Sequence, residues 1–277
     1  MRLAIDYKPP RDGKRAPAGV LKPVFMKLRK IAKFAILIIL VTVFFPASIS
    51  RRQATEQPKQ PFVEPRYSLL VVGDSLSIGL GEQLEQHFAR YSGTVSFERL
   101  GKTSSGLARP DFFDWQKKME ELVEHIRPNI VVVMIGANDK NTLTVRNRSI
   151  AFGTHEWRRE YTARLHRLYE ICRRGNSEVR LFWVGVPIMR DPALSAGLRT
   201  INHIVLSWCR SEPACVFIDT WAKLASENGE YSQYIRDLQS GYSVMARTMD
   251  GVHLTAQGSS LVARETLDSI SKYYSFE

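Results

Sequence analysis

From residue 67 onward, continuous apolar runs alternate with stretches in which apolar residues recur every three or four positions. A short apolar run bounded by turn residues is typical of a buried strand, whereas the longer spacing is typical of a helix that buries one face. The predicted strands span residues 67–72, 94–100, 130–135, 179–186 and 215–218. The predicted helices span residues 78–90, 115–126, 156–173, 193–210 and 255–273, the second beginning after an N-cap at Asp114.

This alternation predicts an α/β fold over residues 67–277. Repeated βα units place their strands side by side in a parallel sheet, with right-handed connections and helices on both faces. Five such strands favour a flavodoxin-like three-layer sandwich. The chain contains no internal repeat.

Polar residues and glycines stand where these strands end. Because a doubly wound sheet collects the carboxyl ends of its strands at one edge, we expect the motifs there to lie together. They are Gly-Asp-Ser-Leu at 73–76, Gly-Lys-Thr-Ser-Ser-Gly at 101–106, Gly-Ala-Asn-Asp at 136–139 and Asp-Gly-Val-His-Leu at 250–254. A serine, a histidine with an acid three residues before it, glycine amides and a side-chain amide are the parts of an acyl-transfer site. In the alternative interpretation, Ser75 or Ser77 only caps the following helix.

Three of these motifs, in this order, resemble those of the GDSL-type or SGNH hydrolases. They are the ones at 73–76, 136–139 and 250–254, and the resemblance covers about residues 67–273. It is poorest at the glycine block, where that family has one glycine soon after an asparagine. This chain offers two glycines there, of which Gly106 is the preferred match and Gly101 the second.

The resemblance implies a serine esterase that needs no cofactor. Ser75 would attack an acyl carbonyl, His253 would take its proton, and Asp250 would orient the imidazole and stabilise its charged form. The oxyanion would be bound by the Ser75 amide, the Gly106 amide and the Asn138 side chain. No metal is expected, since the three cysteines fit no metal-binding spacing.

Other residues at these turns have simpler interpretations. Asp74 and Asp139 are expected to hold their turns through backbone hydrogen bonds rather than to take part in chemistry. Three arginines in loops near the catalytic edge would bind an anionic substrate group or be solvated, and they are Arg109, Arg190 and Arg247. The remaining histidines fall within or beside helical patterns and are expected at the surface, and the tryptophans are expected in the core.

The basic charge of the chain is confined to its first residues. Of 39 Lys/Arg and 28 Asp/Glu, residues 1–52 hold 12 and 2, which leaves 27 and 26 for the rest. The neutral body argues against a nucleic-acid-binding domain, which would need a basic face of its own.

Residues 1–33 are basic, residues 34–50 are mostly apolar and end in small residues, and residues 51–66 are polar with prolines. A basic flank before an apolar run is typical of an export signal, and it keeps the amino terminus in the cytoplasm. We expect a cytoplasmic segment, a signal peptide or transmembrane anchor, and a linker to an extracytoplasmic domain. Cleavage and retention both stay open, and the long basic stretch favours an anchor over secretion.

Cys209 and Cys215 stand six residues apart between a predicted helix and a predicted strand. In an exported protein this pair would form a disulfide or stay reduced, and Cys172 would be a buried thiol.

The resemblance and the compartment together favour an envelope-located esterase that removes an acyl group, acetyl above all, from a glycan or related ester. Two alternatives use the same fold. One is an acyltransferase that moves acyl groups onto a polysaccharide, and the other is a non-catalytic envelope-binding protein. The expected partners are the acylated substrate and the membrane, and no oligomeric state is indicated.

Overall fold

The computed structural model describes residues 65–276. The predicted basic segment 1–33, the signal or anchor segment 34–50 and nearly all of the linker lie outside these residues. Within residues 65–276, none of the helices has the combination of length and apolar character that crossing a bilayer requires.

Five parallel strands form the central sheet in the order β2-β1-β3-β6-β7. This is the flavodoxin-like order, so that prediction is confirmed. The strands are β1 (Tyr67–Gly73), β2 (Val95–Gly101), β3 (Ile130–Met134), β6 (Arg180–Val184) and β7 (Cys215–Ile218). All five residues of β3 are buried, because it lies in the middle of a sheet that helices cover on both faces.

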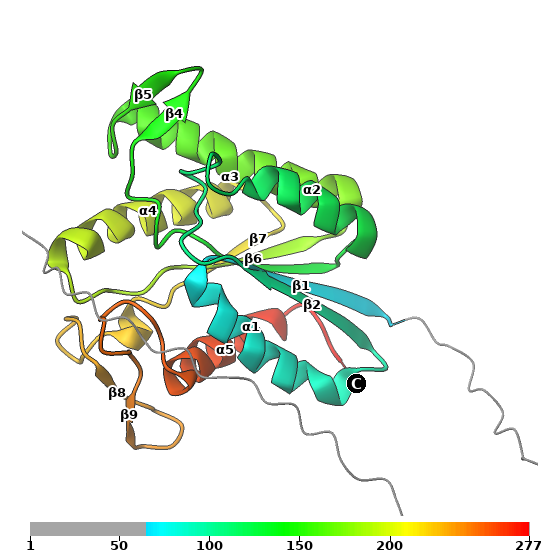
Figure 1. Ribbon diagram of the computed structural model, residues 1–277. Coiled ribbons are helices and arrows are strands. Elements are labelled where there is room, and N and C mark those ends of the chain that lie inside the picture. Colours follow the sequence, from blue (N-terminus) through cyan, green and yellow to red (C-terminus); the bar gives the residue numbers. More distant parts are fainter. Residues whose placement is uncertain (1–64, 277) are drawn as a thin grey trace, which may run out of the picture. The chain divides into compact units, whose positions relative to one another are not determined.

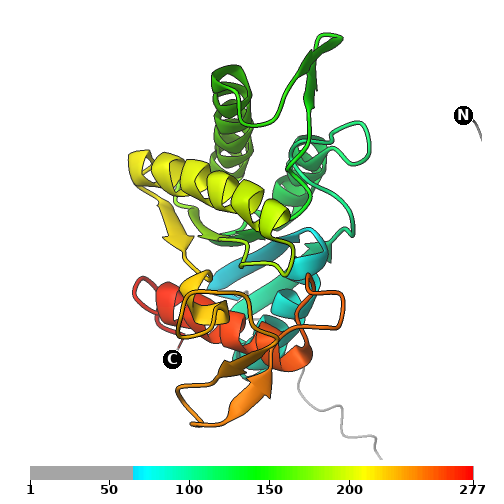
Figure 2. The same cartoon turned by 90° about the vertical axis from the view of Figure 1, so that its left-hand side faces the viewer.

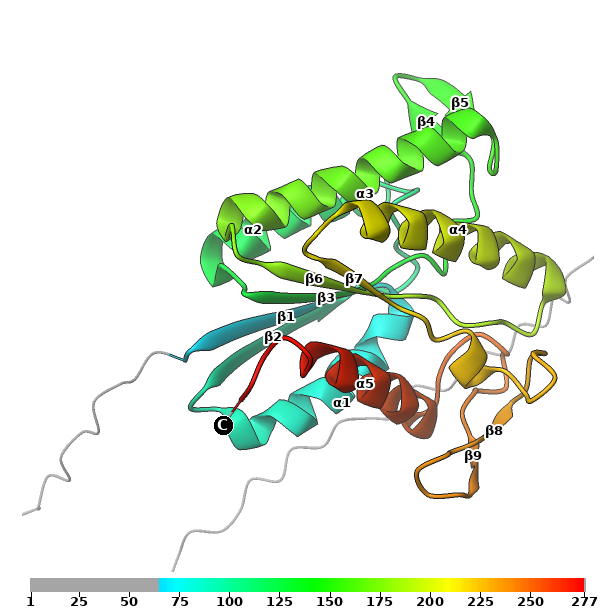
Figure 3. The same ribbon diagram turned by 180° about the vertical axis from the view of Figure 1, so that it is seen from behind.

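Two layers of helices complete the predicted sandwich (Figures 1 and 3). One face of the sheet carries α1 (Ser75–Phe88) and α5 (Ala256–Ile270). The other face carries α2 (Trp115–Ile126), α3 (His155–Gly175) and α4 (Pro192–Ser211). Single 3₁₀ turns follow α1 at Ala89–Tyr91 and β7 at Ala222–Leu224.

Two short antiparallel hairpins were not predicted. They are β4 (Leu143–Val145) with β5 (Arg148–Ile150), and β8 (Tyr234–Arg236) with β9 (Ser243–Met245). Figure 2 shows them as the green and the orange hairpin that project from the layers. Strands of three residues are too short to show an alternating apolar pattern, so the sequence offers no signal for them.

The cysteines lie at the end of α4 and the start of β7. Cys209 and Cys215 form a disulfide, with their Cα atoms 5.0 Å apart. Cys172 is a buried free thiol, and burial raises its pKa to about 12. The bridge therefore ties the connection between α4 and β7, while Cys172 belongs to the core.

Candidate active site

Ser75 is the first residue of α1 and directly follows the turn at the end of β1. The alternative interpretation, in which Ser75 or Ser77 only caps the helix, is wrong, because the N-cap is Asp74, whose side chain accepts from the Leu76 amide at 3.0 Å. The Ser77 hydroxyl donates to the Asp74 carbonyl at 2.7 Å. The Ser75 hydroxyl is therefore not used by the helix start.

The Asp74 side chain also joins the first turn to the third. Its second carboxylate oxygen accepts from the amides of Gly136 and Ala137 at 3.1 and 3.0 Å. Burial raises its pKa to about 6, although hydrogen bonds from the Leu76, Ala137 and Gly136 amides oppose the shift. Asp74 holds the turns together, as predicted, and so sets the position of Ser75 relative to Asn138.

Ser75, His253 and Asp250 form a continuous chain of hydrogen bonds across 178 sequence positions. His253 Nε2 lies 2.9 Å from Ser75 Oγ, and His253 Nδ1 lies 2.6 Å from Asp250 Oδ2. The carboxylate can only accept, so it favours the tautomer with the proton on Nδ1. In that tautomer, Nε2 is free to accept the hydroxyl proton of Ser75, as a general base must.

The other oxygen of the Asp250 carboxylate is fully occupied. Oδ1 accepts from the Thr248 hydroxyl at 2.6 Å and from the amides of Val252 and His253 at 2.8 and 3.0 Å. Desolvation alone would raise the pKa of Asp250, but the bonds from His253, Thr248 and these amides outweigh it and lower the pKa. The carboxylate therefore stays ionised opposite the imidazole. Thr248 was not predicted as a site residue. It lies beside a recognisable turn motif, in which Asp250 binds the amides two and three residues ahead.

Two of the three loop arginines hold the loop that carries the histidine. Arg247 is fully buried and donates to the carbonyls of Val252 and Ile188. Arg190 donates through its amide to the Gly251 carbonyl at 3.0 Å and through Nη1 to the Met249 carbonyl at 2.8 Å. Burial lowers the pKa of Arg247 to about 10. Both arginines therefore serve the architecture of the loop.

Arg109, the third loop arginine, pairs with Asp111 at the surface, at 2.8 Å. The histidines other than His253 lie in α1 to α4 and are exposed or half-buried, as predicted. Four of the tryptophans are buried in the core and Trp221 is partly buried against it.

Two of the predicted oxyanion donors lie on adjoining turns. The Ser75 amide belongs to the first turn of α1, where backbone amides have no partner within the helix. Asn138 donates from Nδ2 to the Ser105 carbonyl at 2.9 Å, which orients the side chain and leaves its second hydrogen for another acceptor.

Gly106, the third predicted oxyanion donor, lies beside the turn that carries Asn138. It is buried against Asp139, whose carboxylate accepts from the amides of Leu107 and Ala108 and from the Tyr161 hydroxyl. The Ser105 carbonyl, one residue before Gly106, accepts from Asn138 Nδ2, so Gly106 adjoins the turn that carries Asn138.

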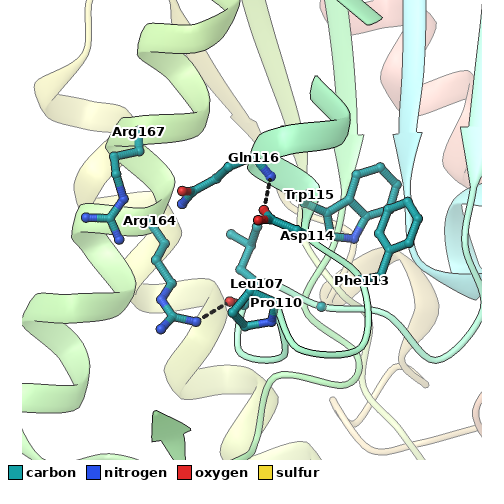
Figure 4. A pocket seen from close by; sticks show the side chains of 9 residues that line it. Leu107, Pro110, Phe113, Asp114, Trp115, Gln116, Arg164 and Arg167 are labelled. Carbon is teal, nitrogen blue, oxygen red and sulfur yellow. Dashed lines mark hydrogen bonds between the residues drawn. The ribbon is translucent and has the colours of Figure 1, made fainter. Parts of the chain in front are cut away.

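The cavity that Gly106 lines, of about 120 Å³, lies between α2 and α3 beside Trp115, Arg164 and Arg167 (Figure 4). Gly101, the second candidate, is exposed and lies beside the first turn of α1. A Cβ there would be 2.3 Å from Cγ1 of Ile78 and 3.3 Å from Oγ of Ser77. Gly101 thus packs against the start of the helix that carries Ser75, and Gly106 packs against Asp139, the neighbour of Asn138.

Gly106→Ala is expected to destabilise the protein by about 1–3 kcal/mol. The added Cβ would lie 2.1 Å from Asp139 Oδ1, and that buried carboxylate cannot move without breaking its hydrogen bonds. Thermal unfolding measures the effect. Gly93→Ala is the matched control, since nothing lies within 4 Å of a Cβ at that position. Equal melting temperatures for the two variants would contradict the packing role of Gly106.

An open cleft of about 360 Å³ gives access to Ser75 and His253. It runs between the first turns of α1 and α5, and the His253 side chain is 45% exposed in it. Polar side chains line much of the cleft besides these two, namely Glu82, Gln83, Thr103, Thr255 and Ser259.

Comparisons with known proteins agree with this architecture. Residues 68–269 match the family model described as "Protein of unknown function (DUF459)". A search of curated proteins found no match.

Among solved structures, a family 3 carbohydrate esterase from Talaromyces cellulolyticus is 15% identical, with a TM-score of 0.53 over 76% of this chain and 100% of that one. A lipolytic G-D-S-L family member from Veillonella parvula is 15% identical, with a TM-score of 0.51 over 74% and 98%. An acetyl esterase mutant with an acetate ion is 14% identical, with a TM-score of 0.52 over 74% and 97%. At these identities the likeness concerns the fold.

Proposed function

The chain belongs to the DUF459 family, and we propose that it is a serine esterase that removes acyl groups through an acyl-enzyme on Ser75. The proposal starts from the SGNH-hydrolase fold and from the motifs at the ends of the strands. The observation that carries the proposal is the chain of hydrogen bonds from Ser75 through His253 to Asp250. A serine hydroxyl is a weak nucleophile until a base takes its proton, and these contacts supply that base together with a group that orients it.

In the proposed reaction, Ser75 Oγ attacks the acyl carbonyl while His253 Nε2 takes the hydroxyl proton. Asp250 stabilises the resulting imidazolium. The protonated His253 then gives its proton to the departing alcohol, and the acyl group stays on Ser75 as an ester. His253 Nε2 then takes a proton from a water molecule as that water attacks the acyl carbon. The bond to Ser75 Oγ breaks, the protonated His253 returns the proton to Oγ, and the free acid leaves.

Asn138→Ala is expected to lower kcat by about 10²–10³-fold, because one donor to the developing oxyanion is lost. The substitution also removes the contact with the Ser105 carbonyl. Steady-state kinetics on a chromogenic acetyl ester measure the loss. Asn141→Ala is the control, since Asn141 donates to the Asn138 carbonyl and has no place in the proposed site. Unchanged kcat in Asn138→Ala would remove this residue from the mechanism.

For the substrate, we propose the acetyl ester of a glycan. The support is the printed names of the similar structures, an acetyl esterase and a carbohydrate esterase, together with polar side chains such as Glu82 and Gln83 along the cleft. An acyltransferase would use the same residues with a sugar hydroxyl in place of water. Product analysis with and without a glycan acceptor separates the two reactions.

We also propose that the domain works outside the cytoplasm, held by residues 34–50 as a membrane anchor. The support is the order of basic, apolar and polar segments in the sequence, together with the disulfide between Cys209 and Cys215. Mass spectrometry of the mature amino terminus tests retention of the anchor. A protein that begins near Arg51 would show that the segment is cleaved.

The central experiment is mass spectrometry of the protein after rapid acid quenching of its reaction with p-nitrophenyl acetate. We expect one acetyl group on the peptide that contains Ser75. Acetyl groups found only on lysines, with hydrolysis still observed, would show that the reaction does not pass through Ser75. A lack of any turnover on small acyl esters would favour the non-catalytic alternative.

A further inference from the structure

Resting on the proposed function, we infer that Thr248 is a positioning residue of this site. Its hydroxyl holds the Asp250 carboxylate in the one rotation that keeps Oδ2 directed at the imidazole of His253. Thr248 itself touches neither Ser75 nor the cleft that leads to it.

The two oxygens of the Asp250 carboxylate have different hydrogen-bond partners. Oδ1 accepts three hydrogen bonds, from the Thr248 hydroxyl, the Val252 amide and the His253 amide. Oδ2 lies 2.6 Å from His253 Nδ1, its one hydrogen-bond partner among residues 65–276. Three donors on one oxygen fix the carboxylate plane, so the oxygen left over faces the ring.

The Thr248 hydroxyl is the strongest candidate among these donors for holding the side chain. It lies 2.6 Å from Asp250 Oδ1 and 3.2 Å from the His253 carbonyl, so its single proton goes to the carboxylate. The Asp250 side chain is 48% exposed. Without the hydroxyl, water competes for Oδ1, and the carboxylate gains freedom to turn away from the imidazole.

The position of Thr248 does not depend on its own hydroxyl. Its amide donates to the His253 carbonyl at 2.9 Å, and its carbonyl accepts from the Gly251 amide at 3.1 Å. The neighbouring Arg247 is anchored to Ile188 and Val252. A residue of the same shape without a hydroxyl should therefore leave the backbone of the loop in place, which makes the inference testable by substitution.

The test compares Thr248→Val, which keeps the shape, with Thr248→Ser, which keeps the hydroxyl. We expect Thr248→Val to lower kcat by about 10- to 100-fold with KM unchanged, as for loss of a hydrogen bond to a charged group. Thr248→Ser should retain kcat within about threefold of the wild-type protein. Thr248→Cys, with a weak thiol donor, should fall near the valine variant and serves if Thr248→Val does not fold.

A second measurement separates positioning from general stability. The rate at which a fluorophosphonate modifies Ser75 reports the competence of the nucleophile and base without any deacylation step. Thr220→Val is the matched control. The buried Thr220 hydroxyl donates to the Gly185 carbonyl at 2.6 Å and does not bind Asp250. We expect Thr220→Val to lower the melting temperature and leave the modification rate unchanged, and Thr248→Val to do the reverse.

The outcomes distinguish this inference from the proposed function. If the fluorophosphonate modifies Ser75 in Thr248→Val as fast as in the wild-type protein, the role of Thr248 is overturned and the esterase proposal stands. Loss of activity in Thr248→Ser equal to that in Thr248→Val would also overturn it, because the hydroxyl would then not be the group that matters. If Ser75 in the wild-type protein does not react at all, both proposals fall together.

Discussion

Ser75→Ala is expected to lower kcat on a chromogenic acetyl ester by about 10⁶-fold, to the level supported by binding and the oxyanion donors alone. His253 Nε2 lies 2.9 Å from the hydroxyl oxygen of Ser75. Removal of this hydroxyl leaves the base without a proton to take and the acyl group without an oxygen to bind. The fold should be retained, because Asp74 and not Ser75 caps α1.

Ser77→Ala is the control for this experiment. Ser77 lies two residues further along the same helix and is buried, and its hydroxyl donates to the Asp74 carbonyl. This variant should lose some stability and keep its turnover. Matched turnover of Ser75→Ala and the wild-type protein would end the nucleophile assignment, whatever the fold.

Asp250→Asn is expected to lower kcat by about 10⁴-fold with little change in the fold. The three donors on Oδ1 all require an acceptor, so the asparagine will place its carbonyl oxygen there. Its amide nitrogen then faces His253 Nδ1 as a donor. This selects the tautomer with the proton on Nε2, which cannot accept the proton of Ser75.

Asp191→Asn is a suitable control, because Asp191 caps α4 through the amides of Ala193 and Leu194 and lies outside the proposed site. Steady-state kinetics should show a loss confined to Asp250→Asn, and proton NMR of the imidazole should show that the tautomer has changed. An Asp250→Asn variant with wild-type kcat would mean that the carboxylate does not orient the histidine.

The main features of the fold could be read from the sequence because they depend on local patterns. The apolar runs at 67–72 and 130–135 are strands β1 and β3, because a short continuous apolar run bounded by turn residues fits a strand covered on both faces. Asp114 caps α2 as predicted, because its side chain reaches two amides within its own turn. The starts and ends of elements were less certain, and α1 begins at Ser75 rather than at residue 78.

The placement of Ser75, Asn138 and the Asp250–His253 pair at one edge was also predictable, since the ends of parallel strands meet there. Between Gly106, the preferred match, and Gly101, the second, the motif alone did not decide. The structure packs Asp139 against Gly106 and the start of α1 against Gly101, and the role of Gly106 as an oxyanion donor stays a prediction. The roles of Arg190 and Arg247 were not predictable from the sequence either. Arg190 binds the Met249 carbonyl, about sixty positions further along the chain, and Arg247 binds the Val252 carbonyl of the same loop.

The succession of strands and helices and the chemical groups at the strand ends are encoded locally, because hydrophobic period, caps and turn residues act over a few neighbouring positions. Which of those groups touch depends on the packed fold. The 2.9 Å contact between Ser75 and His253 and the burial of Arg247 both depend on segments far apart in the sequence. Their geometry is set by how the layers and loops pack against one another.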